Sequence, residues 1–183
     1  MPARMEMPAN AHDAHATTDT PWLTAAELER CLAVRDLTDP SQGPHAMQRI
    51  VDAVVENLDA SWHTDVRVIR RHPVVGLDDN YDRLGYPADS VTREARYTRY
   101  VGPGRLLRSH TTAMIPGALR DLAAEPAPPS DVLLVTPGLC YRRDAVDWQH
   151  TGTPHQMDLW RISRRRRLDD RDLVEMIGLV VAA

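Results

Sequence analysis

The sequence predicts an α+β fold in which an antiparallel β-sheet is flanked by helices, and three observations favour this class. Two runs with strand-like alternation, residues 141–146 and 155–162, lie on either side of a turn that contains Gly152 and Pro154. Residues 44–61 repeat apolar side chains at three- and four-residue spacing, which is typical of an amphipathic helix. The strand runs are separated by loops, occasional helices and hairpin turns, an order that favours antiparallel neighbours.

Length and composition indicate one ordinary globular domain. The chain has 183 residues, 43% of them hydrophobic, and a net charge of −4, which argues against a protein that coats nucleic acid. Its two cysteines, Cys31 and Cys140, lack metal-type spacing. Because the sequence shows neither a membrane-spanning apolar run nor a signal-peptide core, we expect a reduced, cytoplasmic protein without a membrane partner.

The N-terminal part begins with a predicted disordered leader, residues 1–20, in which His12 and His15 belong to a solvated tail because no third metal ligand is near. Residues 21–183 are predicted to form the folded domain. Its first helix starts at the capping box of Thr24 and Glu27 and runs to about Val34.

The remaining elements follow from the same signals. Residues 44–61 form the longest predicted helix, and residues 65–69 form a strand after it. We expect a short helix at 115–122 and an apolar strand at 131–135 that ends in the turn Thr136-Pro137-Gly138. The arginine run 164–167 is followed directly by acidic residues, which favours a solvated face, and a final helix starts at Asp169 or Asp170.

Polar side chains converge on the predicted hairpin. Period-two alternation places Arg142 and Asp144 on one face of its first strand, and Gln156 and Asp158 on one face of its second. His150 lies in the connection. Because unpaired buried charges are costly, so many convergent polar groups need water or a ligand. The hairpin is therefore the candidate site.

The hairpin also resembles motif 2 of the class II aminoacyl-tRNA synthetases, most closely that of phenylalanyl-tRNA synthetase α chains. That motif begins with an aromatic residue, Arg, any residue and an acidic residue. A small residue, a β-branched residue and Asp follow, then a loop that contains a histidine, and finally His-Gln-x-Glu. This sequence supplies it without a gap over eighteen positions, as Tyr141, Arg142, Asp144, Val146, Asp147, His150, His155, Gln156 and Asp158. It departs from the motif in two places, since Asp158 replaces Glu and Leu159 replaces Gly.

Three upstream segments show the same resemblance in the same order. Residues 44–61 with the strand 65–69 resemble motif 1, the helix and strand of the dimer interface. Residues 78–100 resemble the N-F-D-x-L, P-x-D and R-D segments of the phenylalanyl enzymes, and Tyr100 stands where an aromatic residue lines the amino-acid pocket. Residues 106–112 resemble L-L-R-T-H-T-S, so that His110 and Thr112 would contact the amino acid. A single histidine at a strand end is often structural, but its order relative to motif 2 favours the functional interpretation.

The resemblance implies adenylation, in which an amino-acid carboxylate attacks ATP with Mg²⁺ held mainly by phosphate oxygens. Arg142 would neutralise the α-phosphate, Asp144 would accept from the adenine side or orient the loop, and His150 would reach the outer phosphates. The amino acid would be held by His110, Thr112, Gln156 and Asp158. Motif 3, whose arginine holds the ATP tail, has no counterpart before Ala183. Residues 21–183 therefore resemble a partial catalytic domain.

Three functions stay open from the sequence. The first is an adenylating enzyme or the N-terminal half of a split one. The second is a catalytically silent paralogue that regulates or assembles another protein. The third is a structural module in which Arg142 pairs with Asp144 or Asp158 and no pocket remains.

The resemblance implies both a small-molecule substrate and macromolecular partners. One is an apolar or aromatic amino acid, although phenylalanine itself is disfavoured. Others are tRNA or another acyl acceptor, and either a second copy bound through residues 44–61 or a complementing C-terminal chain. Alternation places Leu159 on the face opposite Gln156 and Asp158, so its bulk should stay out of the pocket.

Overall fold

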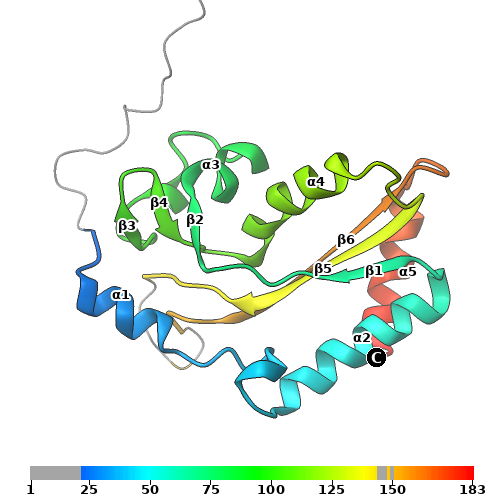
Figure 1. The fold of residues 1–183 in the computed structure, drawn as a ribbon, viewed down its shortest axis with the longest axis horizontal. Coiled ribbons are helices and arrows are strands. Elements are labelled where there is room, and N and C mark those ends of the chain that lie inside the picture. Colours follow the sequence, from blue (N-terminus) through cyan, green and yellow to red (C-terminus); the bar gives the residue numbers. More distant parts are fainter. Residues whose placement is uncertain (1–21, 144–147, 149–150) are drawn as a thin grey trace, which may run out of the picture.

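The computed structural model describes residues 22–143, 148 and 151–183 (Figure 1). The predicted leader, Asp144, Asp147 and His150 lie outside the described residues. The helices are α1 Ala25–Leu32, α2 Ala46–Trp62, α3 Leu77–Asn80, α4 Ile115–Ala124 and α5 Asp170–Val181. The strands are β1 Asp65–Val68, β2 Val74–Gly76, β3 Tyr100–Gly102, β4 Arg105–Leu107, β5 Asp131–Leu139 and β6 His155–Ser163. Short 3₁₀ turns occupy Pro40–Gln42, Asp82–Leu84, Val91–Arg93 and Thr111–Met114.

These strands form two three-stranded sheets, which we call sheet A and sheet B. Sheet A has the order β1-β5-β6 and sheet B the order β2-β4-β3. Three of the four strand pairs are antiparallel, whereas β1 runs parallel to β5 because α2 and β1 precede a long crossover through sheet B and α4. The predicted α+β class, with antiparallel sheets and flanking helices, is confirmed.

The hairpin of sheet A differs from the predicted one. β6 pairs along its whole length with β5, from Asp131 opposite Ser163 to Leu139 opposite His155, and not with residues 141–143, the described part of the predicted first strand. The predicted turn at 136–138 is therefore wrong, because β5 continues through it. β1 pairs with β5 only as far as Val135, so Pro137 lies where that edge of β5 needs no backbone donor. The strand can thus contain a proline that normally signals a turn.

Helices cover both faces of sheet A, as Figure 1 shows, with α4 on one side and α2 and α5 on the other. Leu133 and Val135 pack against Val54 and Leu58 of α2, and α5 adds apolar contacts to the same cluster. Val132 and Leu134 point the other way and pack against Ile115, Ala118 and Leu122 of α4. This alternation buries every residue of β5 and makes it the centre of the domain.

The helix ends follow from the local sequence. Thr24 and Glu27 form the predicted capping box of α1, and Asp169 forms a second one with Asp172 at the start of α5. His45 caps the start of α2, because its ring accepts the Met47 N–H, and His63 caps the end in the left-handed conformation. Arg164 to Arg167 are exposed, which confirms the predicted solvated face.

Sheet B and α1 close the end of sheet A near which the candidate site lies. Cys31 of α1, Leu107 of β4, Leu139 of β5 and Tyr141 form one buried cluster. This cluster fixes the segment after β5 between α1 and sheet B. None of the helices in the described part of the chain combines the length and apolarity that a bilayer crossing requires.

Candidate functional site

The candidate site lies on the face of sheet A that α4 covers only in part. Gln156 is opposite Gly138 and Asp158 is opposite Thr136, so their side chains share a face with Cys140 and Arg142 by alternation. The Cys140 thiol donates to Gln156 Oε1 over 3.1 Å, so these two side chains meet. Met157 and Leu159 point into the opposite cluster with α2 and α5. The prediction that Leu159 stays out of the site is therefore confirmed.

Arg142 is held by its backbone on both sides. Its N–H donates to Gly152 O over 2.8 Å, so the hairpin extends beyond the regular strands, and its carbonyl accepts from Arg99 Nε over 2.9 Å. An isolated bridge pairs it with Thr98. The guanidinium donates from Nε to the Ser109 carbonyl over 2.9 Å. Arg142 is thereby aimed at the segment that carries His110.

The sequence suggested that His110 ends a strand, but the structure places it outside any strand. β4 stops at Leu107, and His110 precedes the 3₁₀ turn Thr111–Met114. Strand alternation therefore does not apply to His110 and Thr112. The segment is positioned by Asn80, which is fully buried: Asn80 Nδ2 donates to Ser109 Oγ over 2.9 Å, and Ser109 N–H donates to Asn80 Oδ1 over 3.1 Å.

The imidazole of His110 is buried and has unused hydrogen-bonding capacity. Within residues 22–143, 148 and 151–183, no hydrogen bond meets either ring nitrogen. The ring stacks on Tyr86, with centroids 5.6 Å apart and planes at 13°, and meets the edge of Tyr81. Burial lowers the pKa of His110, Arg142 lowers it further, and the Asn80 backbone and Asp158 oppose the shift. The ring is therefore neutral at pH 7.

A cavity of about 190 Å³ opens beside this ring. It is lined by Tyr81, Tyr86, Thr92, Tyr97, Ser109, His110 and Arg142. An unpartnered buried imidazole and a guanidinium thus face one small cavity whose other walls are mainly tyrosine. Since buried polar atoms are normally hydrogen-bonded, the two nitrogens indicate a ligand or water position.

The other described site residues that the sequence predicted, Tyr100, Thr112, Gln156 and Asp158, do not line this cavity. Tyr100 faces a separate cavity of about 160 Å³, its hydroxyl donates to Arg93 O, and burial raises its pKa to about 12. Thr112 is not among the residues that line the His110 cavity. Asp158 acts electrostatically on His110, while its carboxylate accepts from Trp160 Nε1 and the Leu159 N–H. Among the described residues it forms no ion pair with Arg142, so that part of the structural-module interpretation is wrong.

Sequence reasoning missed the tyrosines of the cavity wall. Tyr81 occupies the aromatic position of the N-F-D resemblance, so that signal was present, but nothing in the sequence brings Tyr86 and Tyr97 beside it. The Tyr81 ring is fully buried and its hydroxyl donates to Thr92 O. Two 3₁₀ turns fold residues 82–93 back over it, and this compact loop creates the wall.

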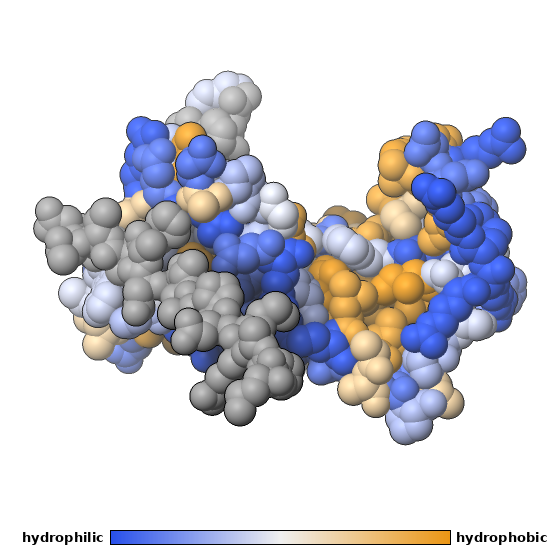
Figure 2. Space-filling view, turned by 90° about the horizontal axis from the view of Figure 1, so that it is seen from above, coloured by the Kyte–Doolittle hydropathy of each residue, from blue (hydrophilic) through white to orange (hydrophobic). Residues whose placement is uncertain are grey.

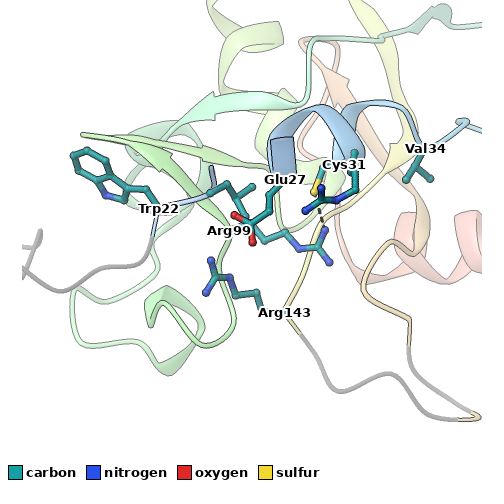
Figure 3. A pocket seen from close by; sticks show the side chains of 8 residues that line it. Trp22, Glu27, Cys31, Val34, Arg99 and Arg143 are labelled. Atoms are coloured by element: carbon teal, nitrogen blue, oxygen red, sulfur yellow. Dashed lines mark hydrogen bonds between the residues drawn. The ribbon is translucent and has the colours of Figure 1, made fainter. Parts of the chain in front are cut away.

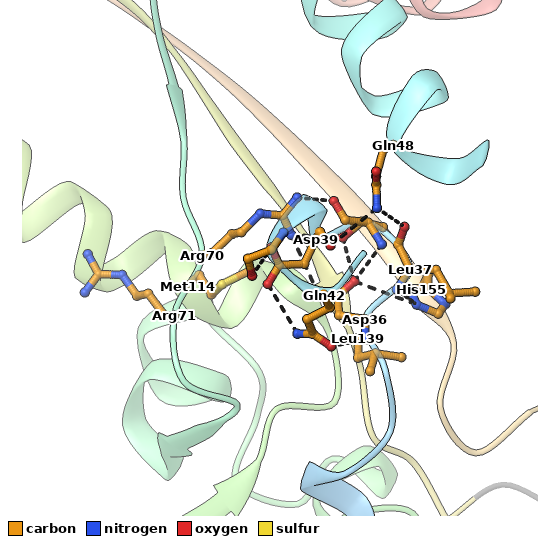
Figure 4. A network of polar contacts seen from close by, with 12 residues as sticks. Asp36, Leu37, Asp39, Gln42, Gln48, Arg70, Arg71, Met114, Leu139 and His155 are labelled. Atoms are coloured by element: carbon orange, nitrogen blue, oxygen red, sulfur yellow. Dashed lines mark hydrogen bonds and ion pairs between the residues drawn. The ribbon is translucent and has the colours of Figure 1, made fainter. Parts of the chain in front are cut away.

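His155 has a structural role that its place in the motif did not suggest. Its Nε2 accepts the Leu37 N–H over 2.9 Å and lies 3.7 Å from the Asp36 carboxylate (Figure 4). The contact ties the loop between α1 and α2 to the start of β6. Because Nε2 accepts a backbone donor, His155 is neutral there, and burial lowers its pKa.

Arg108 continues this polar network beneath Leu139. It is 4% exposed and donates to the carbonyls of Leu139 and Arg71 over 2.7 and 2.8 Å. A Cβ at Gly138 would lie 2.7 Å from its Nη2, so the strand needs a glycine at that point. The charged network supports β5 from below the site and does not enter the His110 cavity.

Comparison with known proteins places the chain in a family. The model of the tRNA synthetases class II core domain (F) matches residues 11–178. A phenylalanine–tRNA ligase alpha subunit from Prochlorococcus marinus (strain MIT 9313) is 40% identical over 149 residues, which are 80% of this chain and 41% of that protein. The corresponding subunit from Synechocystis sp. is 32% identical over 126 residues, 68% of this chain and 35% of that protein.

A solved structure shares the fold at low sequence identity. The pyrrolysyl-tRNA synthetase of Desulfitobacterium hafniense superposes with a TM-score of 0.56 at 14% identity, over 75% of this chain and 46% of that one. The chain spans less than half the length of each of these relatives. The match over residues 11–178 nevertheless covers most of the chain. The protein therefore belongs to the class II tRNA synthetase core-domain family.

Proposed function

We propose that the cavity beside His110 binds an amino acid and that Arg142 presents it to ATP for adenylation of its carboxylate. One observation carries this proposal: a buried imidazole with two unpartnered nitrogens shares a cavity of about 190 Å³ with a guanidinium. A neutral imidazole accepts a hydrogen bond from an ammonium group, and a guanidinium attracts carboxylate or phosphate oxygens. Both ends of an amino acid would thus find a partner.

The chain's residues fit ATP at the α-phosphate. The Nε bond of Arg142 to the Ser109 carbonyl leaves its two terminal nitrogens free of any other described partner, and a planar fork suits phosphate oxygens. Class II synthetases use ATP with Mg²⁺. The described residues contain no cluster of acids, histidines or cysteines that could hold a metal by itself. We therefore assign Mg²⁺ to the triphosphate oxygens.

The other proposed roles follow the sequence resemblance. Gln156 and Asp158 lie on the same sheet face and would orient the bound amino acid, Asp158 through its field at His110. Thr112 and Tyr100, which lie outside the cavity, would support its walls. Asp144 and His150 remain proposed ATP ligands on the sequence resemblance alone.

The size of the cavity supports an apolar or aromatic amino acid of limited bulk. A dry cavity of roughly 150 Å³ holds a benzene ring, so about 190 Å³ accommodates a ring or a branched aliphatic side chain. Part of that volume must hold the ammonium and carboxylate. A substrate smaller than phenylalanine therefore fits best.

The acyl acceptor and the assembly are also proposals. Because the relatives are phenylalanine–tRNA ligase alpha subunits, we propose tRNA or a similar acceptor. A second copy or a complementing chain would cover apolar side chains that α2, β1 and α5 expose, namely Ile50, Val68, Leu173, Val174, Ile177 and Val181. On the face seen from above, the side of sheet A on which α4 lies, Figure 2 shows a hydrophobic patch between hydrophilic borders.

A silent paralogue that binds an amino acid without activating it is the second candidate. It would use the same cavity, because holding an amino acid needs the buried imidazole of His110 and the guanidinium of Arg142 but no ATP. The two candidates differ in chemistry and not in amino-acid binding.

Calorimetry with each of the twenty amino acids tests the binding step. We expect one apolar amino acid to bind the wild-type chain and His110→Gln to weaken binding at least tenfold. Binding should also fall as the pH drops through the lowered pKa of His110, since the imidazolium repels an ammonium group. Unchanged affinity in His110→Gln would remove the cavity from this role.

A further inference from the structure

A second and larger pocket lies on the other side of the segment that carries Arg142. It has a volume of about 660 Å³ and is lined by Trp22, Leu23, Glu27, Arg30, Cys31, Val34, Arg99 and Arg143 (Figure 3). Arg142 lines the His110 cavity whereas Arg143 lines this pocket, as expected for neighbours in an extended segment. The two spaces are therefore distinct. We call the larger one the α1 pocket.

Guanidinium groups outnumber carboxylates in the α1 pocket. Arg30, Arg99 and Arg143 line it together with one acid, Glu27. Glu27 is already engaged, because its Oε2 accepts from the Thr24 N–H and hydroxyl, and the Thr24 backbone bond holds its pKa low. Glu27 can offset at most one of the cationic charges. Among the described lining residues, Arg30 and Arg99 therefore leave a positive excess over Glu27 without counting Arg143.

Arg99 is fixed in place by neutral groups. Its Nε donates to the Arg142 carbonyl over 2.9 Å and its Nη1 donates to the Cys31 sulfur over 3.1 Å (Figure 3). In the described part of the chain no carboxylate lies within ion-pair distance of Arg99. A rigid, partly buried guanidinium with unneutralised charge is a suitable receptor for an oxyanion.

An aromatic side chain stands at the border of the same pocket. Trp22 is 47% exposed although its indole is the largest apolar side chain of the pocket wall. Exposed indole rings provide a surface on which a nucleobase stacks. An oxyanion receptor and a stacking surface within one pocket of about 660 Å³ match a phosphate joined to an aromatic base.

We propose that the α1 pocket is a nucleotide-binding site, in which Arg30 and Arg99 bind the phosphate and Trp22 stacks on the base. It is separate from the amino-acid and ATP site proposed above and stands whether or not that site is catalytic. The ligand is either a mononucleotide or the end of a single-stranded RNA, since both carry this chemistry.

Binding of 5′-AMP, a short oligoribonucleotide and inorganic phosphate to the full chain tests the proposal. Calorimetry supplies the affinity, and quenching of tryptophan fluorescence, absent in Trp22→Phe, reports contact with the base. We expect Arg30→Gln to weaken AMP or oligonucleotide binding about tenfold. Arg49→Gln is the matched control, because it removes the same charge from an exposed helical position outside the pocket. Trp22→Ala should also weaken binding on the order of tenfold.

Each outcome decides the proposal. Equal binding of AMP and oligonucleotide identifies a mononucleotide ligand, and tighter oligonucleotide binding identifies an RNA end. No binding of either at millimolar concentration, equal losses in Arg30→Gln and Arg49→Gln, or inorganic phosphate binding as tightly as AMP would overturn it. Arg30→Gln should leave amino-acid affinity at the His110 cavity unchanged, which separates the two sites.

Discussion

Asn80→Ala should destabilise the candidate site in a way that its partner Ser109→Ala does not. Asn80 is fully buried and makes two hydrogen bonds to Ser109, one to the hydroxyl and one from the backbone N–H. Ser109→Ala removes only the hydroxyl bond, which leaves one N–H of the buried Asn80 amide without its acceptor. Asn80→Ala removes both and leaves the Ser109 N–H without its acceptor. The Ser109 carbonyl, which holds Arg142, lies on the same residue.

The expected magnitudes follow from these counts. A lost hydrogen bond costs about 1 kcal/mol, and an unsatisfied buried donor adds to that. Asn80→Ala loses two bonds and should cost about 3 kcal/mol, whereas Ser109→Ala loses one and should cost about 1.5 kcal/mol. For a chain of this size the melting temperature should fall by about 6–12 °C in Asn80→Ala and by about 3–6 °C in Ser109→Ala.

Urea unfolding and thermal scans measure both changes, and calorimetry measures amino-acid affinity. We expect Asn80→Ala to weaken amino-acid binding, because the backbone that positions His110 and Arg142 loses its anchor, whereas Ser109→Ala keeps that anchor. The double variant should be less stable than Asn80→Ala by at most about 0.5 kcal/mol, because Asn80→Ala already removes the bond to the hydroxyl. Equal destabilisation by the two single changes would refute the assigned contacts.

Three other predictions concern charge and association. Arg142→Gln should abolish ATP binding in calorimetry but lower stability by only about 1–2 kcal/mol, the worth of its bond to the Ser109 carbonyl; unchanged ATP affinity would remove Arg142 from that role. Asp172, whose pKa the Arg166 hydrogen bond lowers to about 2, should make the wild type more stable than Asp172→Asn at pH 7. This advantage should shrink as the pH falls from about 4 to about 2, and a constant difference in urea unfolding would contradict it. In sedimentation, Ile50→Asp should shift a homodimer towards monomer more than Val91→Asp, an exposed apolar control; a wild-type monomer at high micromolar concentration would refute the homodimer.

Local signals predicted α1, α2, α4 and α5 and the course of β6. The capping box of Thr24 and Glu27 and the apolar stripe of α2 depend on neighbours within two helical turns, so the sequence alone contains them. Alternation along β6 also depends only on neighbouring residues, and it correctly placed Gln156 and Asp158 on the sheet face that Leu159 does not occupy.

Long-range pairing could not be predicted in the same way. Pro137 can lie inside β5 because β1 stops beside Val135 and leaves that edge unpaired. Gly138 suits the strand because the buried Arg108 side chain fills the space where a Cβ would be. Both causes come from segments distant in sequence. The cavity wall of Tyr81, Tyr86 and Tyr97 likewise exists only after residues 82–93 fold back, so sequence analysis selected Tyr100, which faces a different cavity.

Amino-acid-dependent exchange of pyrophosphate into ATP tests the central claim most directly, because it detects adenylation itself. The full chain is assayed with ATP, Mg²⁺ and each of the twenty amino acids, and Arg142→Gln and His110→Gln serve as paired variants. The account predicts exchange with an apolar amino acid, abolished in Arg142→Gln and reduced in His110→Gln. Exchange with only a charged amino acid would contradict the substrate assignment, and amino-acid binding without any exchange would contradict adenylation and favour the silent paralogue.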